Sequence, residues 1–187
     1  MAKTYARWAA GVFALALVAN AQAQQSTGAA SDSEMIAKAT SAAPPSIAKG
    51  ATVVAMNPDG SMRTLQKGTN SFTCMMLDAQ TPMCADPNGM AWGGAMMKHA
   101  PPPNAVGFVY MLAGDNGASN TDPYARTKTA SNHWVTTGPH VMIVGPGVKQ
   151  MQGYPRSPDA DPTQPYVMWA GTPYEHLMIP VASGQQP

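Results

Sequence analysis

The sequence predicts an α+β fold that is mostly β, with an antiparallel or mixed sheet, one or two short helices and long Pro/Gly-rich loops. Two observations support this prediction. Short apolar runs recur along the chain with turn residues between them, and this pattern is typical of strands. The 187 residues also include 18 prolines and 17 glycines, which favour turns and loops over helix.

Two short helices are predicted. The first covers residues 34–39, because Ser33 offers a polar cap and the prolines at 44–45 end the helix. The second begins near Asp86, whose carboxylate can accept free backbone N–H groups, and the proline that follows suits the first helical position. The apolar stripe of this second helix would consist of Met90, Ala91, Ala95 and Met97.

The remaining elements are predicted strands. The turn sequence Asn-Pro-Asp-Gly at 57–60 predicts that the first two strands pair as a hairpin. Residues 106–112 are the most apolar run after the N-terminal segment and predict a central strand buried on both faces. Long loops, where functional groups are often placed, are expected over 114–132 and 146–165. The predicted strands are 51–56, 62–66, 71–76, 106–112, 140–145, 166–171 and 175–181.

The N-terminal segment has the three parts of a cleavable export signal. Lys3 and Arg7 supply positive charge, residues 9–19 are uncharged and apolar, and Ala-Gln-Ala at 21–23 matches a signal peptidase site. The apolar stretch is too short to span a bilayer as a helix, which needs about 20 residues. We therefore expect a periplasmic or secreted protein with a signal peptide at 1–23, a disordered leader at 24–33 and a single globular domain at 34–187.

The charge of the chain argues against two classes of partner. The sequence has 11 Lys and Arg against 10 Asp and Glu, and loss of Lys3 and Arg7 with the signal would leave a net charge of −1. A nearly neutral chain lacks the basic surface that holds nucleic acid or anionic lipid. We expect no nucleic-acid partner and no membrane span after signal cleavage.

Two cysteines are present, Cys74 and Cys84. An even number of cysteines in an exported protein predicts a disulfide, and a Thr-Pro turn signal between them lets the thiols meet. Closing so short a loop stabilises the fold by about 3 kcal/mol through chain entropy. The alternative is a metal site on both thiols, which usually has the tighter C-x-x-C spacing.

Four segments carry distinctive motifs, among them Gly-Pro-His-Val-Met-Ile at 138–143 and Tyr-Glu-His-Leu-Met at 174–178. These motifs resemble a family of secreted bacterial proteins that are usually labelled hypothetical. The resemblance covers about residues 41–182, and it implies a compact secreted domain without an assigned activity, ligand or catalytic residue. The four segments are 68–74, 118–123, 138–143 and 166–178.

Two histidines share the pattern His-x-Met-Ile. Side chains two residues apart on a strand share a face, so His140 should lie beside Met142, and His176 beside Met178. Imidazole and thioether ligands suit copper, particularly Cu(I), and the chain contains 15 methionines. These four residues are therefore candidate copper ligands, although methionine is also a common gap-filler in cores. A second candidate set, around the second helix, is Met90, Met96, Met97 and His99.

Three other hypotheses remain open. A small-molecule site would combine both histidines with loop polar groups and aromatic rings. A secreted hydrolase would use one histidine as general base with Ser119 as a nucleophile, although no G-x-S-x-G motif is present, and the sequence does not decide whether the chain is an enzyme. The third hypothesis is a structural or interaction role at the cell envelope. The candidate ligand-binding residues are His140, His176, Asn120, Asp122, Trp169 and Tyr174.

Overall fold

The computed structural model describes Met1 and residues 31–181. The predicted signal peptide and most of the predicted leader lie outside the described residues. Helix α1 (Asp32–Thr40) begins before residue 34, where the globular domain is expected to start. Ser31 caps this helix in place of Ser33: the Ser31 hydroxyl accepts the Glu34 N–H at 3.3 Å, and the Glu34 carboxylate accepts the Ser31 N–H at 2.8 Å. This reciprocal pair is a capping box.

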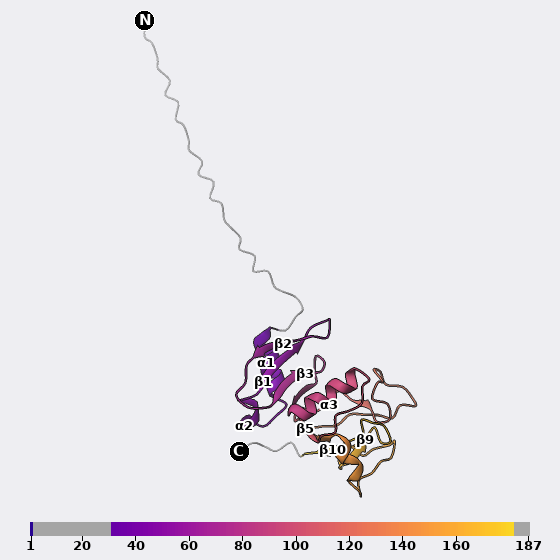
Figure 1. The fold of residues 1–187 in the computed structure, drawn as a ribbon. Helices are drawn as coiled ribbons and strands as arrows, with labels where there is room; N and C mark the ends of the chain where they lie inside the picture. The colour runs from indigo at the N-terminus through magenta and orange to yellow at the C-terminus, as the bar shows by residue number, and fades with distance from the viewer. Residues whose placement is uncertain (2–30, 182–187) are drawn as a thin grey trace.

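A mixed sheet forms the body of the fold (Figure 1). Within residues 31–181 it has eight strands in the order β2-β1-β3-β4-β5-β8-β10-β9, and every neighbouring pair is antiparallel except β1 with β3. The strands are β1 (Thr52–Met56), β2 (Met62–Gln66), β3 (Thr73–Met76), β4 (Pro82–Ala85), β5 (Gly107–Met111), β8 (His140–Val144), β9 (Tyr166–Met168) and β10 (His176–Pro180). This confirms the predicted α+β, mostly β class.

Most predicted strands are present, with two corrections. The β1–β2 hairpin forms around the predicted turn, and β5 occupies the middle of the sheet. The prediction that β5 is buried on both faces is wrong, because Phe108 is 45% exposed. Strand β4 was not predicted from the sequence, since it has only four residues, begins with a proline and lacks alternation; proline is accepted at the first position of a strand.

Two helices pack on opposite faces of the sheet. Helix α1 covers a cluster that includes Cys74 and Cys84, and α3 (Pro87–Met97) covers a cluster that includes Met75 and Val109. A third short helix, α2 (Pro45–Ala48), and a 3-10 turn, η1 (Pro146–Gln150), complete the described helical elements.

The cap of α3 is the one predicted, but its buried face is different. The Asp86 carboxylate accepts the Gly89 N–H at 2.7 Å. The buried residues are Gly89 and Trp92, and they replace the predicted stripe. Gly89 lies so close to β5 that an added Cβ would be 2.9 Å from the Phe108 carbonyl oxygen. The helix turns this face to the sheet because only glycine permits that approach.

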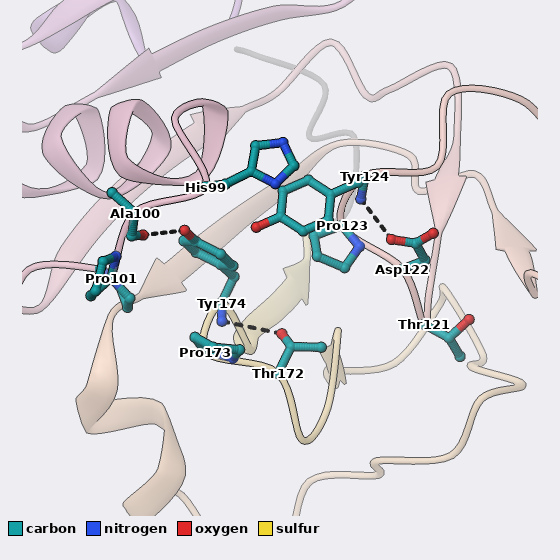
Figure 2. Close-up of a pocket in the computed structure, with 11 residues that line it drawn as sticks. His99, Ala100, Pro101, Thr121, Asp122, Pro123, Tyr124, Thr172, Pro173 and Tyr174 are labelled. Atoms are coloured by element: carbon teal, nitrogen blue, oxygen red, sulfur yellow. Dashed lines mark hydrogen bonds between the residues drawn. The ribbon is translucent and has the colours of Figure 1, made fainter.

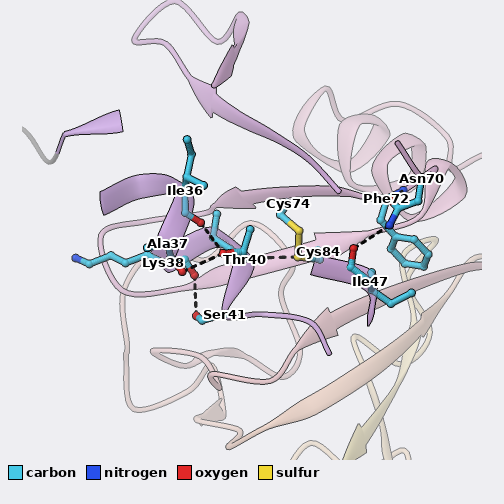
Figure 3. Close-up of a disulfide and its surroundings, with 11 residues drawn as sticks. Ile36, Ala37, Lys38, Thr40, Ser41, Ile47, Asn70, Phe72, Cys74 and Cys84 are labelled. Atoms are coloured by element: carbon cyan, nitrogen blue, oxygen red, sulfur yellow. Dashed lines mark hydrogen bonds between the residues drawn. A yellow bond between two sulfur atoms is a disulfide. The ribbon is translucent and has the colours of Figure 1, made fainter. Parts of the chain in front are cut away.

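The two cysteines form the predicted disulfide (Figure 3). Cys74 on β3 and Cys84 on β4 are direct cross-strand partners with Cα atoms 4.0 Å apart. Both are fully buried beneath α1. Their thiols are thus committed to each other and do not serve as metal ligands.

The long loops run beside β9, the strand at one edge of the sheet. The Val167 N–H donates to the Pro155 carbonyl, and the Trp169 N–H donates to the Asn120 carbonyl, both at 2.9 Å. Between β5 and β8 there is also a small two-stranded sheet of β6 (Ala118–Ser119), inside the first predicted loop, and β7 (Trp134–Val135), just beyond it. None of the helices in the described residues is long and apolar enough to cross a bilayer.

Candidate metal and ligand site

One face of the sheet carries a row of methionines beneath α3. Side chains directly opposite on neighbouring strands share a face, and three such pairs are methionine with methionine. Between this face and α3 lies a cavity of about 250 Å³, which we call the methionine cavity. The methionines that line it are Met56, Met62, Met75, Met83, Met90, Met96, Met97, Met111, Met142, Met168 and Met178.

His140, the first residue of β8, lines the methionine cavity and is fully buried. Its Nδ1 lies 2.6 Å from the Gly138 carbonyl oxygen. Because a carbonyl only accepts, Nδ1 carries the proton and Nε2 keeps its lone pair. That Nε2 is buried without a hydrogen-bond partner among the described residues. An unpaired buried acceptor costs free energy, so this atom is available to a metal or a ligand.

His176, the first residue of β10, repeats the arrangement. It is 1% exposed and lines the same cavity, and its Nδ1 donates to the Tyr174 carbonyl at 3.1 Å. The imidazole meets two indoles edge-on, with ring centroids 4.7 Å from Trp169 and 5.3 Å from Trp92. These contacts hold the ring with Nε2 free of the backbone.

Both histidines are held in the neutral form. Burial lowers the pKa of His176 to about 4; the hydrogen bond to Tyr174 opposes this shift, and nearby His140 adds to it. Burial also lowers the pKa of His140, against the hydrogen bond to Gly138 and the charge of Asp115. A neutral imidazole is the form that binds a metal ion.

The register of β8 and β10 places the four candidate copper ligands predicted from the sequence along the wall of one cavity. Met142 is the cross-strand partner of Met178. His140 and His176 lie two residues before these methionines on the same face, and all four side chains line the cavity. Trp169 lines it as well.

Sequence reasoning missed two further methionines beside the histidines. Met111 on β5 is the cross-strand partner of His140, and Met168 on β9 is the partner of His176. Each is the last residue of its strand. The apolar runs around them were visible in the sequence, but which strands lie side by side was not.

Two of the predicted ligand-binding residues lie elsewhere, in a more open pocket of about 500 Å³ (Figure 2). The Asp122 carboxylate accepts the Tyr124 N–H at 2.9 Å, and the Tyr174 hydroxyl donates to the Ala100 carbonyl. The His99 imidazole stacks on the Tyr124 ring with centroids 4.0 Å apart. The side chains of Asp122 and Tyr174 therefore do not line the cavity of His140 and His176, and Tyr174 contacts His176 through its backbone carbonyl.

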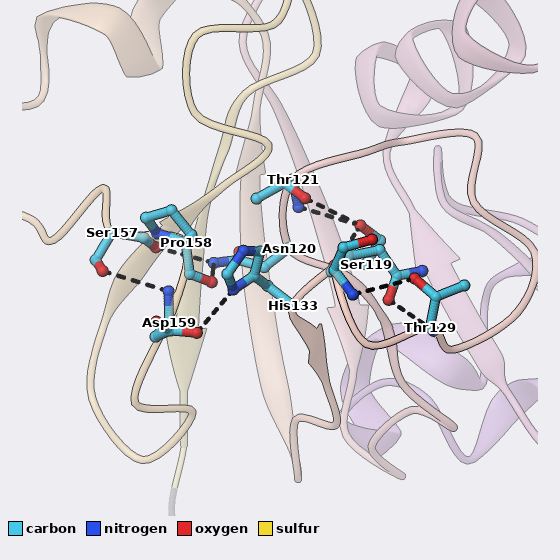
Figure 4. Close-up of polar contacts among 10 residues, drawn as sticks. Ser119, Asn120, Thr121, Thr129, His133, Ser157, Pro158 and Asp159 are labelled. Carbon is cyan, nitrogen blue, oxygen red and sulfur yellow. Dashed lines mark hydrogen bonds and ion pairs between the residues drawn. The ribbon is translucent and has the colours of Figure 1, made fainter.

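Asn120 and Ser119 tie loops together (Figure 4). The Asn120 amide donates to the carbonyls of residues 157 and 158 at 3.0 and 2.7 Å. The Ser119 hydroxyl donates to the Asn132 carbonyl at 2.7 Å and accepts the Asp122 N–H at 2.9 Å. Across residues 31–181, neither cavity histidine hydrogen-bonds a hydroxyl: their bonds go to backbone carbonyls. The structure therefore does not form the nucleophile–base pair of the hydrolase hypothesis.

The second candidate metal set, around α3, is divided between the two pockets. Its three methionines line the methionine cavity, whereas His99 lines the open pocket. In the described part of the chain, no group of three or more His, Cys, Asp or Glu side chains is placed to hold a metal ion. A metal in the methionine cavity would therefore use methionine sulfur atoms.

The wall of the methionine cavity reaches the protein surface. Two of the methionines that line it, Met62 and Met97, are each 50% exposed, whereas His140 and His176 in the same lining are buried. Thioether ligands are therefore present at the surface as well as beside the histidines.

The fold and the site thus define an α+β domain with one disulfide and a cavity of methionine and histidine side chains. Comparison with known proteins finds no matching family model, no similar curated protein and no similar solved structure.

Proposed function

We propose that this chain is an exported protein that binds a soft metal ion, Cu(I), in the methionine cavity. The observation that carries this proposal is the Nε2 lone pair of His140, which is buried without a partner in a cavity lined by eleven methionines. The proposed ligands are drawn from His140, His176, Met142 and Met178, which line this cavity.

The chemistry of these ligands favours copper. Thioether sulfur is a soft donor that suits Cu(I), and imidazole suits copper as well. Histidines that bind metals usually donate the other ring N–H to a carbonyl or carboxylate, which fixes the ring and the tautomer. His140 and His176 both have this second hydrogen bond, to the carbonyls of Gly138 and Tyr174.

The charge of the site favours a monovalent ion. Imidazole and thioether ligands are neutral, and burying a charge without a counter-charge is costly. The two carboxylates that line the cavity, Asp78 and Asp115, both accept backbone N–H groups of their own turns. Because the ligands of each bound ion are neutral, a monovalent ion is bound at lower cost than a divalent one, so Cu(I) should bind in preference to Zn(II).

Export is part of the proposal. The N-terminal segment has the charge and hydropathy pattern of a signal peptide, and disulfides persist in oxidising compartments. The Cys74–Cys84 disulfide supports this location.

Anaerobic titration with Cu(I) against a colorimetric Cu(I) chelator tests the proposal. The purified protein with its disulfide intact should take Cu(I) from the chelator and should show no binding of Zn(II). The double variant Met142→Leu/Met178→Leu removes both sulfurs at nearly constant volume, and it should bind Cu(I) at least tenfold more weakly.

The matched control is Met76→Leu/Met151→Leu, since these methionines pack in clusters outside the methionine cavity. The control should bind as the wild type does. Absence of Cu(I) binding by the wild type, or equal losses in both double variants, would overturn the proposal.

A second candidate function is binding of a small aromatic alcohol. It is supported by a second buried polar atom of the cavity, the indole nitrogen of Trp92. The Trp92 Nε1–H is also buried without a partner and lines the same cavity. With His140 Nε2 as acceptor, the cavity would offer one donor and one acceptor to a hydroxyl group. Apolar cavities of about 150 Å³ already bind benzene. Calorimetric titration of the metal-free protein with phenol should show binding that Trp92→Phe weakens, and no heat of binding would exclude it.

A further inference from the structure

The methionine cavity has an internal two-fold relationship. Strands β8 and β10 are antiparallel with Met142 opposite Met178, so a local two-fold axis passes between these two residues. The axis relates His140 to His176, and the shared pattern His-x-Met-Ile follows it on both strands.

The relationship extends to the strands on either side of this pair, β5 beside β8 and β9 beside β10. Met111 on β5 pairs with His140, and Met168 on β9 pairs with His176. One step inward, Val109 pairs with Met142 and Tyr166 pairs with Met178. The two pairs of strands, β5 with β8 and β9 with β10, therefore have the same register around their histidine.

Two further details repeat in both halves. The chain at the end of β5 and of β9 has the same sequence pattern, Met-x-Ala-Gly. Both glycines have a left-handed backbone, with φ of 77° at Gly114 and 81° at Gly171. Each histidine also directs its Nδ1 to the carbonyl oxygen two residues before it. The repeat thus includes the hydrogen bond that leaves Nε2 free.

We infer that the methionine cavity holds two Cu(I) ions, one in each half. This inference rests on the proposed function. One ion takes His140, Met111 and Met142, and the other takes His176, Met168 and Met178.

The strand geometry permits three ligands in each half. Residues opposite each other have Cβ atoms about 5 Å apart, and residues two apart on a strand are about 7 Å apart. Each histidine has one methionine in each of these positions. Methionine has three rotatable bonds, so both sulfurs can approach the same Nε2.

The same geometry separates the backbone positions of the two histidines. His140 is opposite Pro180, and Pro180 lies four residues from His176, which is about 13 Å along the strand. Side chains stand roughly perpendicular to a sheet. Each histidine therefore has its own cross-strand and same-strand methionine, and the inference gives each its own ion.

The two halves differ in their aromatic neighbours, and this difference supplies a spectroscopic signature. Trp92 and Trp169 stack with centroids 6.0 Å apart, and both lie against the His176 ring. An ion bound by His176 is therefore beside two indoles and should quench their fluorescence. An ion bound by His140 should quench it less.

Anaerobic native mass spectrometry with tryptophan fluorescence tests this inference. The wild type should bind two Cu(I) per chain. Met111→Leu should lose one ion and keep most of the quenching, whereas Met168→Leu should lose the other ion and most of the quenching. Met76→Leu should keep both ions, and near-UV circular dichroism checks that each variant is folded.

The outcomes separate this inference from the proposed function. One ion per chain that is lost in both Met111→Leu and Met168→Leu would mean a single shared site, which overturns the two-ion inference and leaves Cu(I) binding in place. Two ions that neither variant removes would overturn the ligand assignment. No Cu(I) bound by the wild type would overturn both.

Discussion

Met142 on β8 lies directly opposite Met178 on β10, and this pair joins the two halves of the methionine cavity. Met178 is 1% exposed, whereas Met142 is partly buried. Met178 therefore contributes more to core packing than Met142 does. Substituting Met178 in the metal-free protein measures its packing contribution apart from metal binding.

Met178→Ala should destabilise the domain by about 2–5 kcal/mol, because it removes a buried side chain and leaves a cavity. Met178→Leu should cost less than about 1.5 kcal/mol, because the volume is conserved. Urea unfolding of the metal-free protein measures both. Similar losses for the two variants would show that the sulfur, and not the volume, stabilises this position.

The stability of the metal-free protein should fall on acidification between pH 6.5 and 4. The pKa of His176 is about 4 in the fold against 6.5 for free histidine, so in this range the unfolded chain binds a proton that the folded chain does not. Stability therefore rises with pH by about 3 kcal/mol across this window. The lowered pKa of His140 acts in the same direction, and the raised pKa of Asp115 opposes it at the acid end.

Urea unfolding at several pH values measures this dependence. His176→Gln should flatten the curve, and the control His99→Gln, at an exposed position, should leave it unchanged. A wild-type stability that is constant from pH 4 to 6.5 would contradict the burial of a neutral His176.

Two glycines of α3 form a matched pair. A Cβ at Gly89 would lie 2.9 Å from the Phe108 carbonyl oxygen, whereas a Cβ at Gly93 would meet nothing within 4 Å. Gly89→Ala should therefore push α3 away from β5 and cost about 1–3 kcal/mol. Gly93→Ala should stabilise the helix by up to about 1 kcal/mol. Thermal unfolding of both variants checks the signs, and a stabilising Gly89→Ala would mean that the helix does not approach the strand this closely.

Loss of the disulfide should reduce stability without removing the metal site. Cys74→Ala/Cys84→Ala should cost about 3 kcal/mol or more, from the released loop and the lost side-chain packing. The disulfide packs beneath α1, and the methionine cavity lies beneath α3 on the other face. Well below its unfolding temperature, the variant should bind Cu(I) as the wild type does; loss of binding in a folded variant would show that the faces are coupled.

The features predicted from the sequence are those set by local pattern. The turn at 57–60 fixes the β1–β2 hairpin, and the two-residue period of a strand places His140 beside Met142 and His176 beside Met178. The Asp86 cap is local in the same sense. Each depends on residues a few positions apart.

The features that were missed depend on which segments meet in space. Met111 and Met168 join the histidines through pairing between strands far apart in the sequence. Asp122 was expected near the histidines, but its long loop takes it to the open pocket. The Tyr174 side chain lines that pocket too, although its backbone carbonyl accepts the His176 N–H. The buried face of α3 is set by the contact of Gly89 with β5, and hydrophobicity within the helix does not reveal it.

The loop contacts along β9 have a consequence for association between molecules. The outermost strand of a sheet can recruit a strand from another protein through its unpaired N–H and C=O groups. On β9 and just beyond it, the outward N–H groups of Val167 and Trp169 already donate to the carbonyls of Pro155 and Asn120. The long loops thus oppose strand addition at this edge. They keep molecules of this methionine-rich, β-rich domain from associating edge to edge there.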